Sequence, residues 1–223
     1  NPQHKPFKGV AQSIPGVVET EHYDDGPAGV AYFDVDEQNR GTPYRENTQV
    51  DIEKRSDASN GHGIGWVRAT EWLVYTVDVT KAGNYVLEIP VASKLSGGTF
   101  HIEFEGRNVT GPITIPDTGG WDKLQTLSLT GVKLKKGRQI MKLVMGKNGE
   151  NGGIGDIDLV RFTREQTLGS SGFSKTAKRP SNTFEVSGFW DPDSRCFGKL
   201  TLSPIVDTKL GVYPLVNRIK NGA

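Results

Sequence analysis

The chain has 223 residues and a formal net charge of +1; 24% of its residues are charged and 35% are apolar. This composition is ordinary for a globular protein, and the small net charge argues against electrostatic capture of nucleic acid or of an anionic membrane. No apolar run approaches the roughly 20 residues that span a bilayer, so we predict no membrane span.

Residues 1–13 have the character of a linker, and we expect the folded domain to begin near residue 14. From there the chain contains several segments in which apolar side chains alternate with polar ones. The clearest are WLVYTVDV (72–79), NYVLEIPVA (84–92) and TFHIEFEG (99–106), followed by the shorter runs IMKLVM (140–145) and DIDLVRF (156–162). A period of two is typical of strands that bury one face.

Turn sequences separate these segments, among them KAGN, SGG, GRN, DTGG, KKG and KNGENGG. Strands of five to eight residues that recur every 8–12 residues indicate an antiparallel sandwich or barrel. No window of the chain shows a helical stripe of apolar residues. The sequence therefore predicts an all-β antiparallel sandwich over residues 14–164.

The composition changes after this domain. Residues 165–183 are polar and rich in Gly, Ser and Pro, as in a linker or an extended surface segment. FEVSGFW (184–190), KLTLSPIV (199–206) and KLGVYPLV (209–216) are candidates for short strands, but about 40 residues are too few for a confident independent core. Residues 165–223 are thus predicted to be an extended C-terminal tail of unknown role. Cys196, the single cysteine, lies in it and cannot form an internal disulfide.

One tryptophan stands in an unusual place. In IPDTGGWDKLQT (115–126), Trp121 directly follows two glycines. Glycine favours a turn, and a turn lifts the next residue toward solvent. We therefore expect the ring of Trp121 to be exposed. Trp72, by contrast, lies out of phase with the buried face of its strand and is predicted to be structural.

Four segments in order resemble the family 6 carbohydrate-binding modules: VVETEHYDDGPAGVAYFDVD, GIGWVRATEWLVYTVDV, GGTFHIEFEGRNVTGPITIPDTGGWDKLQT and GGIGDIDLVRF. The resemblance covers residues 14–164. It implies a jelly-roll β-sandwich that binds polysaccharide without catalysis and that is attached to, or associated with, a secreted glycoside hydrolase. The third segment is most similar to modules of agarases and laminarinases, which favours an agar-type galactan or a β-glucan as the ligand. No signal peptide stands at Asn1, so an exported protein would appear here as a mature or excised piece.

The resemblance also implies a sugar site in the loops at one edge of the sandwich. Two aromatic rings clamp a pyranose there, and these positions fall on Trp66 and Trp121. The residue that hydrogen-bonds the sugar hydroxyls is Asn in the family and falls on Asp156 here. An ionised Asp accepts hydrogen bonds but cannot donate them, so this position departs from the family pattern.

A structural calcium ion is the cofactor that the resemblance implies, with Glu19, Glu21 and Asp158 as its acidic ligands. Glu19 and Glu21 are two residues apart, so on an extended strand both would point to one side and repel each other without a cation. Calcium takes 6–8 oxygen ligands, which backbone carbonyls and water would complete. A solvated acidic face is the alternative.

Two other functions stay open from sequence. The chain would be a glycoside hydrolase in its own right if Glu19 with Glu21, or Asp156 with Asp158, formed a carboxylate pair at the required separation. The absence of G-x-S-x-G, H-E-x-x-H and P-loop motifs disfavours catalysis. Alternatively the sandwich is a protein-interaction or adhesion domain in which the tail binds the partner, because fold alone does not assign function.

Overall fold

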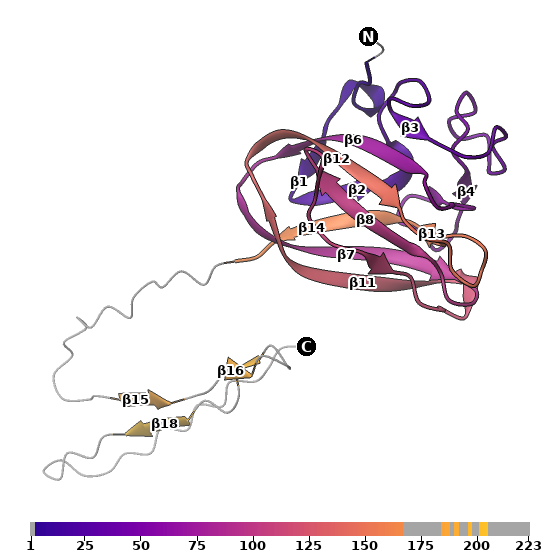
Figure 1. The fold of residues 1–223 in the computed structure, drawn as a ribbon. Helices are drawn as coiled ribbons and strands as arrows, with labels where there is room; N and C mark the ends of the chain where they lie inside the picture. Colours follow the sequence, from indigo (N-terminus) through magenta and orange to yellow (C-terminus); the bar gives the residue numbers. More distant parts are fainter. Residues whose placement is uncertain (1–2, 167–183, 188–189, 192–195, 198–200, 205–223) are drawn as a thin grey trace, which may run out of the picture. The chain divides into compact units, whose positions relative to one another are not determined.

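The computed structural model describes residues 3–166 and, beyond them, the backbone of four short strands at residues 184–187, 190–191, 196–197 and 201–204. The chain divides into two compact units, Asn1–Thr167 and Leu168–Ala223. The first unit consists of two stacked β-sheets (Figure 1).

The first sheet runs in the order β1-β6-β12-β8-β10, with β3 beside β6 and β9 beside β8. Its strands are β1 (Gln12–Ile14), β3 (Tyr32–Phe33), β6 (Trp72–Val79), β8 (Thr99–Phe104), β9 (Arg107–Asn108), β10 (Ile113–Thr114) and β12 (Gly137–Met145). All pairs are antiparallel except β1 with β6, where Gln12 lies opposite Val77 in a parallel ladder. The sheet is therefore mixed at this edge, whereas the sequence predicted an antiparallel sandwich throughout.

The second sheet runs in the order β2-β14-β7-β13-β5-β4, with β11 also paired to β7. Its strands are β2 (Gly16–Glu19), β4 (Ile52–Lys54), β5 (His62–Ile64), β7 (Gly83–Ser93), β11 (Gly120–Leu134), β13 (Asp156–Ile157) and β14 (Leu159–Arg164). Strand β7 pairs with three other strands, β11, β13 and β14. Short strands β5 and β13 continue the sheet at one end of β7.

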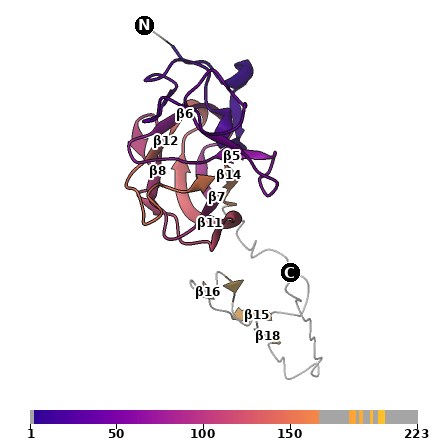
Figure 2. The same cartoon turned by 90° about the vertical axis from the view of Figure 1, so that its right-hand side faces the viewer.

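Alternation of side chains builds the core between the sheets. Tyr75 and Val77 of β6 and Leu87, Ile89 and Val91 of β7 are fully buried. So are Ile102 of β8, Met141 and Leu143 of β12, and Ile157 of the short strand β13. Figure 2 shows the sandwich turned by 90°, with β8 and β12 on one side and β7 and β14 on the other. Because one phase of each strand faces inward, the period-two pattern fixes which residues form the core.

The all-β sandwich with jelly-roll layering is confirmed, and the described residues contain no α-helix. They contain two short 3-10 turns, η1 (Phe7–Gly9) and η2 (Thr20–His22). Glu19 ends β2 and Glu21 lies in η2, so the two do not share one continuous strand as the sequence suggested.

Residues ahead of position 14 are held on the sandwich by hydrogen bonds. Lys5 and Asp25 exchange backbone hydrogen bonds of 2.8 and 2.7 Å. The His4 ring nitrogen Nδ1 lies 2.6 Å from the buried Asp24 carboxylate. Strand β1 then pairs with β6. In the structure the domain thus begins earlier than the predicted boundary, and residues 4–13 belong to it instead of forming a linker.

In the second unit, β15 (Phe184–Ser187) pairs with β18 (Thr201–Pro204), and β16 (Trp190–Asp191) pairs with β17 (Cys196–Phe197). Strand segments thus occur within FEVSGFW and KLTLSPIV, where the sequence predicted them. The third predicted strand, KLGVYPLV, lies outside the described residues.

Candidate functional site

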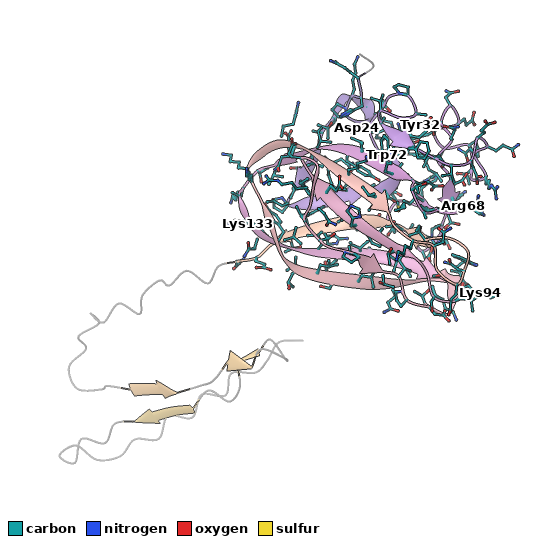
Figure 3. The ribbon with its side chains drawn as sticks, viewed as in Figure 1. Asp24, Tyr32, Arg68, Trp72, Lys94 and Lys133 are labelled. Atoms are coloured by element: carbon teal, nitrogen blue, oxygen red, sulfur yellow. The ribbon has the colours of Figure 1, made fainter. Side chains whose placement is uncertain are left out.

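Four strand ends of the second sheet meet at one end of the sandwich. Ile64 of β5 lies opposite Ile157 of β13, Asp156 opposite Ala92 of β7, and Gly120 of β11 opposite Ser93. In Figure 3, Lys94, which follows β7, marks this end, and Lys133 marks the opposite end. The register therefore places Asp156 between the segment that carries Trp66 and the segment that carries Trp121.

Trp66 is exposed and has an unusual backbone conformation. Its side chain is 48% accessible, and its φ angle is 51°. A bulky residue in the left-handed region is an outlier, because its Cβ approaches the following carbonyl. Such strain costs about 1–3 kcal/mol and persists where the surrounding structure enforces it. Nearly half of the surface of this strained residue is therefore open to solvent.

Trp121 is 43% exposed, as its position after two glycines predicted. Gly119 has φ 84°, and its N–H donates to Asp117 Oδ1 at 2.8 Å, which forms the turn before the strand. Between Gly120 and Gln125 the register against β7 shifts. The residues between them therefore bulge from the ladder, and a bulge of this kind redirects side chains at a sheet edge.

Asp156 lies at the centre of this site but below its surface. It is 5% exposed, and its Oδ2 accepts a hydrogen bond of 2.7 Å from Arg55 Nη1. A Cβ added at Gly65 would lie 3.3 Å from Asp156 Oδ1 and 3.4 Å from Glu53 Oε1. Burial, and then the charge of Glu53, raises the pKa of Asp156 to about 8.

Arg55 is the residue that the sequence did not reveal. It is 6% exposed and its guanidinium contacts three carboxylates, those of Glu53, Asp57 and Asp156. Its Nη2 also donates to the backbone carbonyl of Trp121 at 2.6 Å. Since Asp156 and Trp121 lie 101 and 66 residues away in sequence, no local pattern indicates these contacts.

The predicted calcium residues converge on a loop at Ser59–Asn60. The Ser59 hydroxyl donates to Glu19 Oε2 at 2.8 Å, and the Ser59 N–H lies 3.3 Å from both carboxylate oxygens of Asp158. The Asn60 amide donates to Glu21 Oε1. The structure therefore brings Glu19, Glu21 and Asp158 around one short loop. Within residues 3–166, no three acidic or histidine side chains are drawn together into a ready-made metal cluster.

The donor set nevertheless fits a hard cation. Glu21 is fully buried, and its Oε2 has no hydrogen-bond partner. Burial raises the pKa of Glu21 to about 7, and the charges of Glu19 and Asp158 add to the shift. His22 Nε2 is 3.5 Å from Glu21, but burial lowers the pKa of His22 to about 4, so this ring is neutral at pH 7. An orphaned carboxylate oxygen beside two further carboxylates and no protonated histidine is what a bound calcium ion would satisfy.

A small pocket lies beside Gly65, and residues of both sheets line it. Its polar lining residues are Asp34, Asp51 and Glu71, and its apolar lining includes Phe33 and Met145. Burial raises the pKa of Glu71 to about 8, with the charges of Asp34 and Asp51 adding to it. The Glu71 carboxylate accepts a hydrogen bond from the Arg68 N–H at 3.0 Å. Sequence reasoning did not single out this group.

Within the part of the chain that the structure describes, no helix is long and apolar enough to cross a membrane.

Comparison with known proteins defines the class. The model of the carbohydrate-binding module family 6 matches residues 41–164. The chain therefore belongs to the family 6 carbohydrate-binding modules, and the sandwich is a non-catalytic sugar-binding domain. The prediction of a binding module instead of an enzyme is confirmed by this membership.

Two curated proteins share part of this domain. The clotting factor G alpha subunit of Tachypleus tridentatus is 34% identical over 89 residues, which are 39% of this chain and 13% of that protein. Beta-agarase AgaA of Microbulbifer thermotolerans is 35% identical over 71 residues, 31% of this chain and 16% of that protein. The chain thus matches only a small part of each of these longer proteins.

Solved structures agree on the fold. A β-1,3-glucan-binding family 6 module from Bacillus halodurans covers 69% of this chain and 98% of its own length, with 22% identity and a TM-score of 0.51. An arabinoxylan arabinofuranohydrolase from Bacillus subtilis covers 70% of this chain and 28% of its own length, with 19% identity and a TM-score of 0.51. At these identities the likeness establishes the sandwich fold alone.

Proposed function

We propose that this chain is the targeting module of a secreted glycoside hydrolase and that it holds one sugar ring between Trp66 and Trp121. The observation that carries the proposal is the pair of exposed indoles, 48% and 43% accessible. Trp66 follows β5 and Trp121 begins β11, at the end of the sheet where Asp156 is buried in β13. The polymer we favour is an agar-type galactan or a β-glucan. The agarase relative, 35% identical over 71 residues, supports the galactan. The resemblance of residues 97–126 to modules of agarases and laminarinases supports both polymers.

The physical basis is the two-faced chemistry of a pyranose. Its C–H faces are apolar, and an indole placed over one removes apolar area from water at about 25 cal/mol per Å2, or roughly 1–3 kcal/mol for a covered face. Hydroxyl groups around the ring then require polar partners, and Asp156 is the proposed one. A shallow, hydrated site of this kind binds with micromolar to millimolar dissociation constants, since ordering costs offset much of the gain.

The proposed advantage to an attached hydrolase is effective concentration. A module that rests on an insoluble polymer converts repeated search into diffusion over a short distance. Calcium at Glu19, Glu21 and Asp158 is part of the proposal as a structural ion, since it would tie β2 and its following turn to the segment between β13 and β14.

The test is retention on polymers. The purified chain is incubated with agarose, laminarin, xylan, cellulose and carrageenan while released reducing sugar is measured in the same tubes, with the Trp66→Ala/Trp121→Ala variant as the control. Retention of the parent on one polymer, without sugar release and without retention of the variant, supports the proposal. Equal retention of parent and variant would reject the clamp. No retention on any polymer would favour the alternative, a protein partner bound through the C-terminal tail, residues 165–223.

A further inference from the structure

The guanidinium of Arg55 uses all five of its N–H donors. Nε and Nη2 form a fork with Asp57, at 3.0 and 2.8 Å. Nη1 donates to Glu53 at 2.5 Å and to Asp156 at 2.7 Å, and Nη2 donates its second hydrogen to the Trp121 carbonyl at 2.6 Å. Five donors is the full capacity of this side chain, so its position is determined from three directions at once.

The hydrogen bond from Arg55 to the Trp121 carbonyl reaches a segment of β11 that is irregularly paired. Trp121 lies where the register between β11 and β7 shifts, between Gly120 and Gln125. Residues in a bulge lack the regular ladder bonds that hold a strand in place. The bond from Arg55 ties the Trp121 carbonyl to the same guanidinium that holds Asp156 of β13. Through Arg55, the backbone that carries the exposed Trp121 ring is thus fixed relative to the buried strand β13.

Lysine could not replace Arg55 in this role. An ammonium has three donors on a flexible stem, whereas the planar guanidinium forms bidentate pairs and further bonds in one plane. The side chains of Arg55 and Asp156 are only 5% and 7% exposed, so water does not screen this pair as it would at the surface.

We infer that Arg55 is a positioning residue: it fixes the backbone of Trp121 and so sets the sugar affinity without contacting the sugar. The inference rests on the proposed function, since it assigns Arg55 to the clamp described above. It also makes a claim about Trp121 that holds in the absence of any sugar.

The experiment uses Arg55→Lys and Asp57→Asn in the full chain, with Arg138→Lys and Asp78→Asn as matched controls. Arg138 forms the same fork on Asp78, at 3.1 and 3.0 Å, but on the other sheet and at the surface. Fluorine NMR of fluorotryptophan-labelled protein, with each signal assigned by a Trp→Phe variant, reports on Trp121 separately from Trp66. Affinity for soluble laminarin and for agaro-oligosaccharides is measured on the same samples.

We expect Arg55→Lys to shift or broaden the Trp121 signal and to weaken binding about tenfold or more, and Asp57→Asn to do the same to a smaller extent. The controls should leave both readouts unchanged. If Arg55→Lys does not fold, Asp57→Asn carries the test, because Asp57 is 30% exposed and its loss leaves the other Arg55 contacts in place. An unchanged Trp121 signal in the folded variants would overturn the inference. So would a changed signal with unchanged affinity, provided that Trp121→Ala abolishes binding. If Trp121→Ala binds sugar with normal affinity, the proposed clamp is wrong. The inference about Arg55 and sugar affinity is then wrong too, even if fluorine NMR shows that Arg55 positions Trp121.

Discussion

The ammonium nitrogen of Lys142 on β12 lies 3.8 Å from the ring centroid of Trp72 on β6. Phe33 packs against the same indole, with ring centroids 6.4 Å apart and planes 25° from parallel. A cation over the ring and an aromatic neighbour both contribute to packing. Trp72, labelled in Figure 3, is thus covered from two neighbouring strands, in contrast to Trp121.

This contrast gives the first prediction. Trp121→Ala should weaken sugar binding at least tenfold, which corresponds to about 1.4 kcal/mol, with the fold intact. Trp72→Phe should leave the affinity within about twofold of the parent and lower the thermal stability instead, because it removes packed area. Titration calorimetry and thermal unfolding of both variants check the prediction. If both variants lost affinity equally, the loss could not be assigned to a specific contact between Trp121 and the sugar.

The backbone of Trp66 supplies the second prediction. Trp66→Gly and Trp66→Ala both remove the ring, so both should lose binding. Only glycine relieves the positive φ of 51°, so the glycine variant should be more stable than the alanine variant by about 1 kcal/mol. Urea unfolding of the pair measures the difference. If alanine proves as stable as glycine, the strained conformation is not present in solution.

Much of the framework follows from the sequence because it depends on local alternation. The predicted segments 72–79 and 99–106 correspond to β6 (Trp72–Val79) and β8 (Thr99–Phe104). Burial alternates along β8, whereas in β6 Val74 and Thr76 of the second phase are buried as well. The exposed Trp121 follows from two glycines. These features depend on neighbours in the chain, and a single sequence therefore contains their signal.

The polar contacts of the site could not be predicted in this way. Arg55 meets Asp156 across 101 residues, and Ser59 meets Asp158 across 99. The burial of Asp156 depends on Arg55, and nothing near Asp156 in sequence indicates an arginine partner. Strand β11 also lacked a signal, because Leu127 and Leu129 are only partly buried and most of the strand is exposed. These polar contacts and the pairing of β11 depend on residues far apart in the sequence, which the periodicity of apolar residues does not indicate.

Glu71 provides a prediction about pH. Its pKa of about 8 in the folded chain, against 4.5 for the ordinary side chain, means that the native state keeps a proton that the unfolded state loses. The contribution of this group to stability therefore falls as the pH rises from about 4.5 to 8 and is constant above that. Glu71→Gln should be more stable than the parent by roughly 1–3 kcal/mol at pH 8.5 and about equal at pH 4.

Denaturant unfolding at several pH values checks this expectation. The control is Glu88→Gln, since the Glu88 side chain is 47% exposed on β7 and lies 3.8 Å from Arg161. An exposed pair of this kind contributes little, so the control should follow the parent at every pH. A constant difference between Glu71→Gln and the parent across the range would show that Glu71 titrates normally.

The acidic group around Ser59 gives the last prediction, which links calcium to pH. Without metal, Glu21 with its pKa of about 7 destabilises the native chain progressively as the pH rises from 4.5 to 7, because the buried carboxylate must then ionise. Calcium binds the ionised form, so it should stabilise strongly at pH 8 and weakly at pH 5. At a calcium concentration 100-fold above Kd the gain is about 2.7 kcal/mol, or a rise in Tm of roughly 5–10 °C for a domain of this size. Thermal unfolding with calcium or with a chelator measures this rise in Tm.

Glu21→Gln should lose the calcium response and the pH dependence together, whereas Glu88→Gln should keep both. A parent chain whose Tm is the same in calcium and in chelator at pH 8 would exclude Glu19, Glu21 and Asp158 as a calcium site.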